Sequence, residues 1–165
     1  FKGDTVNIGV GQGYLSATPI QLAYYASFLA NKGNLNNLAF VKNNIDPKVE
    51  AFKAKNLIDT DWQRLHNSMI GVIEDPKGTA KRLKNLKDYI IAAKSGTVEL
   101  VSTDTKEDYK IIREVEGKRD HAIIVAFGPM PNPKYAVSVV IENGESGGSV
   151  AGPVAIKVLN SLLKK

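Results

Sequence analysis

Cysteine is absent from this sequence of 165 residues. Its absence excludes disulfide bonds, thiolate nucleophiles and cysteine-ligated metal sites, but it leaves the compartment open between the cytosol and a bacterial periplasm. Histidine is scarce as well, because His66 and His121 are the only two and have no partners at metal-ligand spacing. We therefore expect two structural histidines, and no metal or other cofactor.

Long hydrophobic runs are also missing. No apolar stretch approaches the roughly 20 residues that cross a bilayer, and no signal peptide is visible. The first residues, from Phe1 to Asp4, include no initiator methionine. We therefore expect the chain to be part of a longer protein, in which a membrane anchor or signal could precede it.

Charge is modest and dispersed. The net charge is +5, and 24% charged with 43% hydrophobic residues is typical of a single globular domain. The densest basic cluster, at 81–87, has no interleaved aromatic residues on which bases could stack. These features exclude a disordered chain and argue against nucleic acid as a partner.

Two helices are predicted in the first half of the chain. The segment Thr18 to Gln21 forms a capping box with proline at the first helical position, and Gly33 is a suitable terminator. A second helix is expected to begin at Thr60 and to end at Asp75, where Pro76 follows. A short strand is expected between the two helices, at 38–41.

The second half reads as three strands and a helix. Apolar runs predict strands at 89–93, 121–127 and 134–141, and an amphipathic pattern predicts a helix at 150–163. The continuous apolar character of 121–127 predicts burial on both faces. The polar segment 99–119 holds one short amphipathic piece around Tyr109, Ile112 and Val115. The fold class is therefore α+β, with an antiparallel meander packed against helices.

The segment Lys94-Ser95-Gly96-Thr97 is the strongest candidate for a functional site. It follows the apolar run 89–93, so a cation and two hydroxyls are expected at the end of a buried strand. Lysine supplies a fixed positive charge, serine and threonine supply hydroxyl donors, and glycine lets a ligand approach the backbone closely. This composition is typical of one wall of an anion-binding cleft.

Three other groups admit more than one interpretation. Arg119-Asp120-His121 is compatible with a catalytic relay or with a salt bridge at the start of a strand. Glu142 and Glu145 could form an acid/base pair or lie in a solvated loop. Ser95 could be a nucleophile, but it lacks the first glycine of the Gly-x-Ser-x-Gly elbow.

The chain also contains one Ser-x-x-Lys sequence, Ser161 to Lys164. In serine acyl-transferases that act on β-lactams, this motif carries the nucleophile and lies at the buried start of a central helix. Here it falls in the last turn of the final predicted helix, where no cleft could exclude water. We interpret it as a chance match.

Taken together in order, several segments resemble the C-terminal half of the transpeptidase domain of class B penicillin-binding proteins, most closely the elongation-type members. The resemblance runs through nearly the whole chain and rests on Gly3-Asp4-Thr5-Val6-Asn7-Ile8-Gly9, Gly11-Gln12-Gly13-Tyr14, Ala17-Thr18-Pro19-Ile20-Gln21-Leu22-Ala23, Gly78-Thr79-Ala80, Ala93-Lys94-Ser95-Gly96-Thr97, Arg119-Asp120-His121-Ala122, Asn132-Pro133-Lys134, Glu142-Asn143-Gly144 and Gly147-Gly148-Ser149.

The resemblance implies a serine-type D,D-transpeptidase that cross-links peptidoglycan stem peptides ending in D-Ala-D-Ala and is acylated by β-lactams. It implies that Lys94 and Thr97 act in catalysis, Thr97 through a backbone N–H in the oxyanion hole. It further implies that Lys94, Ser95, Gly96 and Thr97 bind the substrate. A periplasmic location at the cytoplasmic membrane, with the anchor upstream, is also implied.

The chain departs from the family pattern in one respect. It has no Ser-x-Asn motif, and its sole Ser-x-x-Lys is misplaced, so we expect both genuine motifs and the nucleophile to lie upstream of Phe1. Residues 1–165 would then be the C-terminal portion of one domain, partnered by the remainder of that domain. The sheet would hold three of five family strands, with an unpaired apolar edge at Tyr135 to Ile141.

Two alternatives remain. The first is another enzyme of the same superfamily, a serine β-lactamase or a D,D-carboxypeptidase. The second is a non-catalytic binding module.

Overall fold

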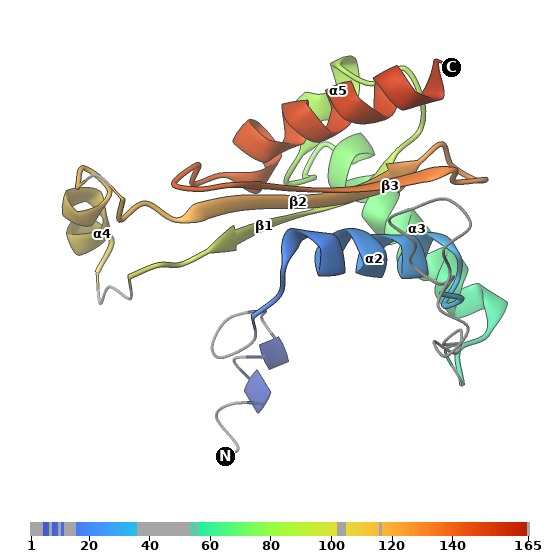
Figure 1. Ribbon diagram of the computed structural model, residues 1–165, viewed down its shortest axis with the longest axis horizontal. Coiled ribbons are helices and arrows are strands. Elements are labelled where there is room, and N and C mark those ends of the chain that lie inside the picture. Colours follow the sequence, from blue (N-terminus) through green and yellow to red (C-terminus); the bar gives the residue numbers. More distant parts are fainter. Residues whose placement is uncertain are drawn as a thin grey trace, which may run out of the picture.

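A computed structural model describes residues 5–6, 8–9, 11, 16–35, 54, 56–101, 105–115 and 117–164. The short strand expected at 38–41 lies outside these residues. The described part of the chain forms the expected α+β arrangement, in which helices cover both faces of a small sheet (Figure 1).

The sheet has three antiparallel strands, β1 (Ala92–Val98), β2 (His121–Gly128) and β3 (Tyr135–Ile141), in the order β1-β2-β3. The predicted meander is therefore confirmed. In the part of the chain that the structure describes, β1 and β3 are the two edges, so the expectation that 135–141 lacks a second partner also holds there.

The first strand was placed too early. Its ladder begins where Ala92 faces Phe127, and Lys94 to Thr97 lie opposite Val125 to Ala122 inside the strand rather than after it. Its partner β2 ends at Gly128, because Pro129 and Pro131 have no backbone N–H with which to extend the ladder. Residues before Ala92 consequently stay outside the sheet.

Two apolar clusters hold the layers together. One face of the sheet is covered by α5 (Gly152–Leu163) and the short 3₁₀ helix η1 (Lys81–Asn85), and the opposite face by α2 (Pro19–Ala30) with part of α3 (Asp59–Glu74) (Figure 1). Side chains of β2 alternate accordingly. Ala122, Ile124 and Ala126 are fully buried, whereas Ile123 and Val125 are only half-buried, so the expected burial on both faces is partly wrong.

Helix α2 confirms its sequence prediction in detail. The Thr18 hydroxyl accepts from the Gln21 N–H at 3.3 Å, and the Gln21 side-chain oxygen accepts from the Thr18 N–H at 2.8 Å. At the other end Gly33 adopts φ +80° and donates to the carbonyl of Phe28.

Helix α3 begins one residue before the predicted Thr60. The carboxylate of Asp61, rather than the Thr60 hydroxyl, satisfies the first turn by accepting from the Ile58 N–H at 3.2 Å. The helix ends at Glu74, so the stop predicted at Asp75 and Pro76 is correct.

The last two helices also shift slightly from expectation. Helix α4 (Lys106–Ile112) is the amphipathic piece predicted in the polar segment, although Val115 lies beyond its end. Helix α5 begins at Gly152 instead of 150, because one wider turn of π-helix, η2 (Gly147–Ala151), precedes it.

Candidate functional site

The segment Lys94 to Thr97 lies on the edge strand β1, along which an extended ligand could pair. Side chains alternate across a strand, and Ala92 belongs to the α2/α3 cluster while Ala93 belongs to the α5/η1 cluster. The Lys94 side chain therefore projects on the α3 side of the sheet. The Ser95 and Thr97 hydroxyls project on the opposite side.

Each polar side chain of this segment has a defined partner. The Lys94 ammonium donates to the carbonyl of Ser95 at 2.6 Å, and the Ser95 hydroxyl lies 2.8 Å from that of Thr79. The Thr97 hydroxyl donates to the main-chain carbonyl of Glu145 at 3.1 Å. The edge strand thus presents one cation and a series of oriented hydroxyls.

Thr79 had no predicted role, although the segment Gly78-Thr79-Ala80 belongs to the family pattern. A Cβ on Gly78 would lie 2.3 Å from the carbonyl oxygen of Val72, so only glycine lets this turn fold back against α3. The Ala80 N–H then donates to the same oxygen at 3.0 Å. These contacts bring the Thr79 hydroxyl to Ser95.

The η2 turn lies directly on the candidate strand. A Cβ on Gly147 would lie 2.1 Å from the carbonyl oxygen of Ile123 and 2.5 Å from that of Gly96. By contrast, the nearest neighbour of a Cβ on Gly96 would be the Ile123 Cβ, at an ordinary 3.7 Å. Packing within the chain therefore requires glycine at position 147 but tolerates a side chain at 96.

An open depression of about 620 Å³ adjoins Lys94. It lies between the second half of α3, the turn that follows it and β1. Polar residue types outnumber apolar ones around it, and the lining residues are Asn67, Ser68, Gly71, Val72, Asp75, Lys77, Gly78, Thr79 and Lys94. The Lys94 ammonium can therefore act on an anionic group that enters between the helix and the strand.

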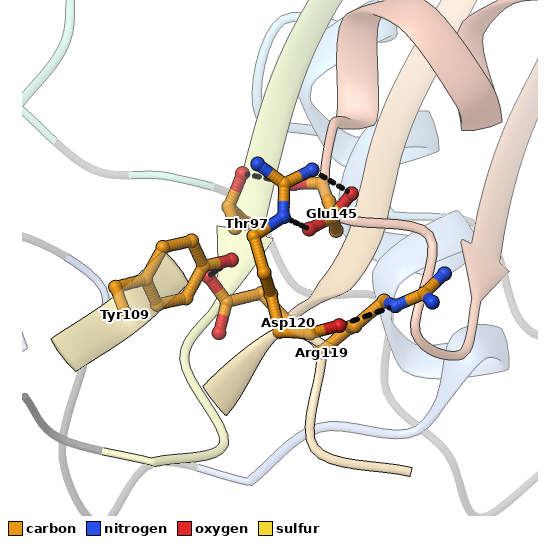
Figure 2. A network of polar contacts seen from close by, with 6 residues as sticks. Thr97, Tyr109, Arg119, Asp120 and Glu145 are labelled. Atoms are coloured by element: carbon orange, nitrogen blue, oxygen red, sulfur yellow. Dashed lines mark hydrogen bonds and ion pairs between the residues drawn. The ribbon is translucent and has the colours of Figure 1, made fainter. Parts of the chain in front are cut away.

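Arg119-Asp120-His121 forms neither a catalytic relay nor a salt bridge at the start of the strand. Asp120 is buried and accepts a 2.7 Å hydrogen bond from the Tyr109 hydroxyl, while Arg119 donates to the carbonyl of Arg113 (Figure 2). His121 accepts from the Asn143 N–H through Nδ1 at 3.1 Å. The hydrogen bond from Tyr109 to Asp120, together with burial, raises the pKa of Tyr109 to about 12.

The two glutamates differ from each other. Glu142 is exposed, in agreement with a solvated loop, but the Glu145 side chain is only 28% exposed and its carboxylate pairs with the guanidinium of Arg113. Both contacts, from Nη2 to Oε2 and from Nε to Oε1, measure 2.8 Å (Figure 2). Glu145 is therefore neither solvated nor paired with Glu142 for acid/base chemistry.

His66 is structural, as predicted. It is 6% exposed, its Nε2 lies 2.8 Å from the carbonyl oxygen of Leu29, and its ring packs edge-on against Phe127. Among the residues described, no cluster of three or more His, Asp or Glu side chains could hold a metal ion. None of the described helices is long and apolar enough to span a membrane.

The Ser-x-x-Lys sequence from Ser161 to Lys164 occupies the last turn of α5 and the residue after it, with Ser161 and Lys164 exposed. Lys164 pairs with the Asp88 carboxylate at 2.9 Å, with both side chains largely in solvent. This position agrees with a chance match.

Comparison with known proteins identifies the family. The model of the penicillin binding protein transpeptidase domain matches residues 1–160. The peptidoglycan D,D-transpeptidase MrdA of Haemophilus influenzae is 33% identical over 99% of this chain, and that of Escherichia coli K12 is 32% identical over 99%. The chain spans only 26% and 27% of the lengths of these relatives.

Solved structures agree. PBP2 of Pseudomonas aeruginosa, crystallised in complex with WCK 5153, superposes with a TM-score of 0.78 at 36% identity and covers 100% of this chain, which corresponds to 34% of that protein chain. PBP2 of Helicobacter pylori, solved in complex with MreC, gives a TM-score of 0.76 at 31% identity; the match covers 98% of this chain and 28% of that one. The family match over nearly the whole sequence, with Lys-Ser-Gly-Thr on an outer strand of the same fold, shows that this chain belongs to the penicillin-binding protein transpeptidase family.

Proposed function

We propose that this chain supplies one wall of the active site of a peptidoglycan D,D-transpeptidase. The observation that carries the proposal is the position of Lys94-Ser95-Gly96-Thr97, on an edge strand beside an open depression, within a family match to residues 1–160. An edge strand can pair with an extended peptide, and the hydroxyls of the same strand can bind the carboxylate of that peptide.

The proposed reaction is acyl transfer through a serine ester. The serine hydroxyl attacks the carbonyl of the penultimate D-Ala, the amide C–N bond breaks, and the departing terminal D-Ala takes up a proton. An amine of a neighbouring stem peptide then attacks the ester, and the serine regains its proton as the cross-link forms. β-Lactams acylate the same serine, because their strained amide resembles D-Ala-D-Ala.

The residues of this chain would act on charge and position. The Lys94 ammonium sets a positive potential at the cleft and assists proton movement around the serine. The hydroxyls of Ser95 and Thr97 hold the substrate carboxylate, and Gly96 leaves room for the substrate backbone. The Thr97 N–H donates to the developing oxyanion, a type of interaction whose loss costs on the order of 10²–10³ in rate.

The nucleophile is proposed to lie outside these 165 residues, since the sequence has no Ser-x-Asn and only the exposed Ser-x-x-Lys at Ser161. The chain would then be the C-terminal portion of a single transpeptidase domain and inactive by itself. The parent enzyme would be anchored at the cytoplasmic membrane, face the periplasm and bind stem peptides and β-lactams.

Covalent labelling of the full-length protein by a fluorescent penicillin tests the proposal. We expect Lys94→Ala to slow labelling by at least about 100-fold, because it removes the cation of the cleft. Lys134→Ala removes another exposed cation, just before β3, and should leave the rate unchanged. Equal labelling of the wild type and Lys94→Ala would contradict the site assignment, and rapid nitrocefin turnover by the wild type would favour a β-lactamase.

A further inference from the structure

A polar network links helix α4 to the candidate strand β1. Helix α4 lies beyond one end of the sheet, apart from both helical layers (Figure 1). Its C-terminal side reaches the loop after β3 through the ion pair between Arg113 and Glu145, and this loop in turn reaches Thr97 (Figure 2). Contacts therefore link three segments distant in sequence, from Arg113 through Glu145 to the Thr97 hydroxyl of the candidate site.

Three groups of Glu145 have partners: the carboxylate, the backbone N–H and the backbone carbonyl. Its carboxylate pairs with Arg113 through a hydrogen bond from Nη2 to Oε2 and an ion-pair contact between Nε and Oε1, which lies outside hydrogen-bond geometry. Its N–H donates to the carbonyl of Asp120 at 2.9 Å, and its carbonyl accepts from Thr97. Its backbone has φ +60°, a conformation that a non-glycine residue adopts only when the surroundings compensate for it. The pair with Arg113 is one such compensation, since a hydrogen bond between charged groups is about twice as strong as a neutral one and the pair is only partly exposed.

Helix α4 is itself secured against the sheet. The hydrogen bond from Tyr109 to the buried Asp120 fixes the middle of the helix to the residue just before β2. Arg119 donates to the carbonyl of Arg113 and fixes the segment just after the helix. The Arg113 guanidinium that pairs with Glu145 therefore belongs to a residue whose backbone is itself fixed against the rest of the fold.

We propose that Glu145, clamped by Arg113, is a positioning residue that sets the Thr97 hydroxyl for recognition of the substrate carboxylate. This inference rests on the proposed function. Without a ligand, the Thr97 proton points to the carbonyl of Glu145, which fixes the position of the oxygen. An arriving carboxylate forms a charge-assisted hydrogen bond about twice as strong as a neutral one, so the proton turns toward the ligand without movement of heavier atoms.

Whether substitution of Glu145 weakens or strengthens recognition of an anionic ligand separates a positioning role from a purely electrostatic one. The Glu145 carboxylate is a negative charge near the proposed anion site, so its removal alone would favour an anionic ligand. A positioning role predicts the opposite, because loss of the clamp lets the loop move and misplaces the Thr97 hydroxyl. Glu145→Gln is the decisive variant, since the side chain keeps nearly the same size.

The test measures second-order acylation rates of the full-length protein with benzylpenicillin and with its methyl ester, in which the carboxylate is masked. For Glu145→Gln we expect about a fivefold to tenfold loss with benzylpenicillin, the value of one hydrogen bond, and less than about a twofold change with the ester. Glu107→Gln makes the same change at an exposed position of α4 and should alter neither rate. Thermal unfolding midpoints of all variants verify that they fold.

A double-mutant cycle tests the route through Thr97. In the background of Thr97→Val, Glu145→Gln should cause no further loss with benzylpenicillin, because the positioned hydroxyl is already gone. Additive losses, an equal loss with both ligands, or a gain with benzylpenicillin would overturn the inference. If the wild type is not acylated, the proposed function fails and the inference with it; if the wild type is acylated and Glu145→Gln behaves identically, the inference alone fails.

Discussion

The close approach of η2 to the sheet makes Gly147→Ala a severe perturbation. The added Cβ would lie 2.1 Å from the Ile123 carbonyl oxygen and 2.5 Å from that of Gly96, whereas real Cβ atoms essentially never come within 3.0 Å of another heavy atom. Both obstructing atoms belong to paired strands that cannot move independently. The η2 backbone must therefore shift by about 1 Å, away from a closely packed interior.

The magnitude follows from this shift. Overpacking of this kind costs about 3 kcal/mol, which corresponds to a fall of roughly 6–12 °C in the unfolding midpoint of a domain of this size. Acylation of the full-length protein by penicillin should fall by about 10²-fold, because a 1 Å displacement of η2 also moves the neighbouring carbonyl of Glu145, which holds the Thr97 hydroxyl of the candidate site.

Differential scanning calorimetry and the rate of penicillin labelling measure the two effects. Gly71→Ala is the matched stability control: a Cβ there would meet nothing closer than the Asp75 Cβ at 4.0 Å, inside helix α3. It should raise stability by about 0.5–1 kcal/mol. Unchanged midpoint and labelling in Gly147→Ala would refute the packing of η2 against the candidate strand.

Three smaller effects are also expected. Thr79→Val keeps the side-chain shape but removes the partner of the Ser95 hydroxyl, so penicillin labelling should slow by about twofold to tenfold. An unchanged labelling rate would show that Thr79 plays no part in the site. Thr18→Ala removes the capping box of α2 and should cost about 1 kcal/mol in chemical denaturation, whereas Thr60→Ala, at a position that caps nothing, should cost less. Hydrogen bonding to Lys87 lowers the pKa of Glu74, so the wild type should have a larger free energy of unfolding than Glu74→Gln above the unfolded-state pKa of about 4.3. This difference should disappear as the pH falls through the folded-state pKa of Glu74. A difference that persists at pH 2 would contradict this pairing.

The sequence predicts best those features that depend on neighbouring residues. The cap formed by Thr18 and Gln21 needs only a spacing of three residues, and the antiparallel meander needs only apolar runs joined by turns. Boundaries that depend on a partner were less accurate. The start of β1 is set by the proline-rich turn that follows β2, which the first strand's own residues do not encode.

The candidate site was predicted in composition but not in its contacts. Lys94 to Thr97 could be selected from residue types, but the contact of Ser95 with Thr79 depends on how Gly78 packs against α3. The bond from Thr97 to Glu145 ends on a main-chain carbonyl, a group that every residue possesses, so no sequence pattern could identify it. The pair between Arg113 and Glu145 likewise joins segments that only the folded sheet brings together.

Intact-mass measurement after exposure to benzylpenicillin tests the central claim most directly. The full-length protein should gain the mass of one penicillin, and peptide mapping should place the adduct on a serine outside residues 1–165. The chain of 165 residues alone should gain no mass. An adduct on a serine within this chain, or no adduct on the full-length protein, would contradict the claim that Lys94 to Thr97 form one wall of an acylating site.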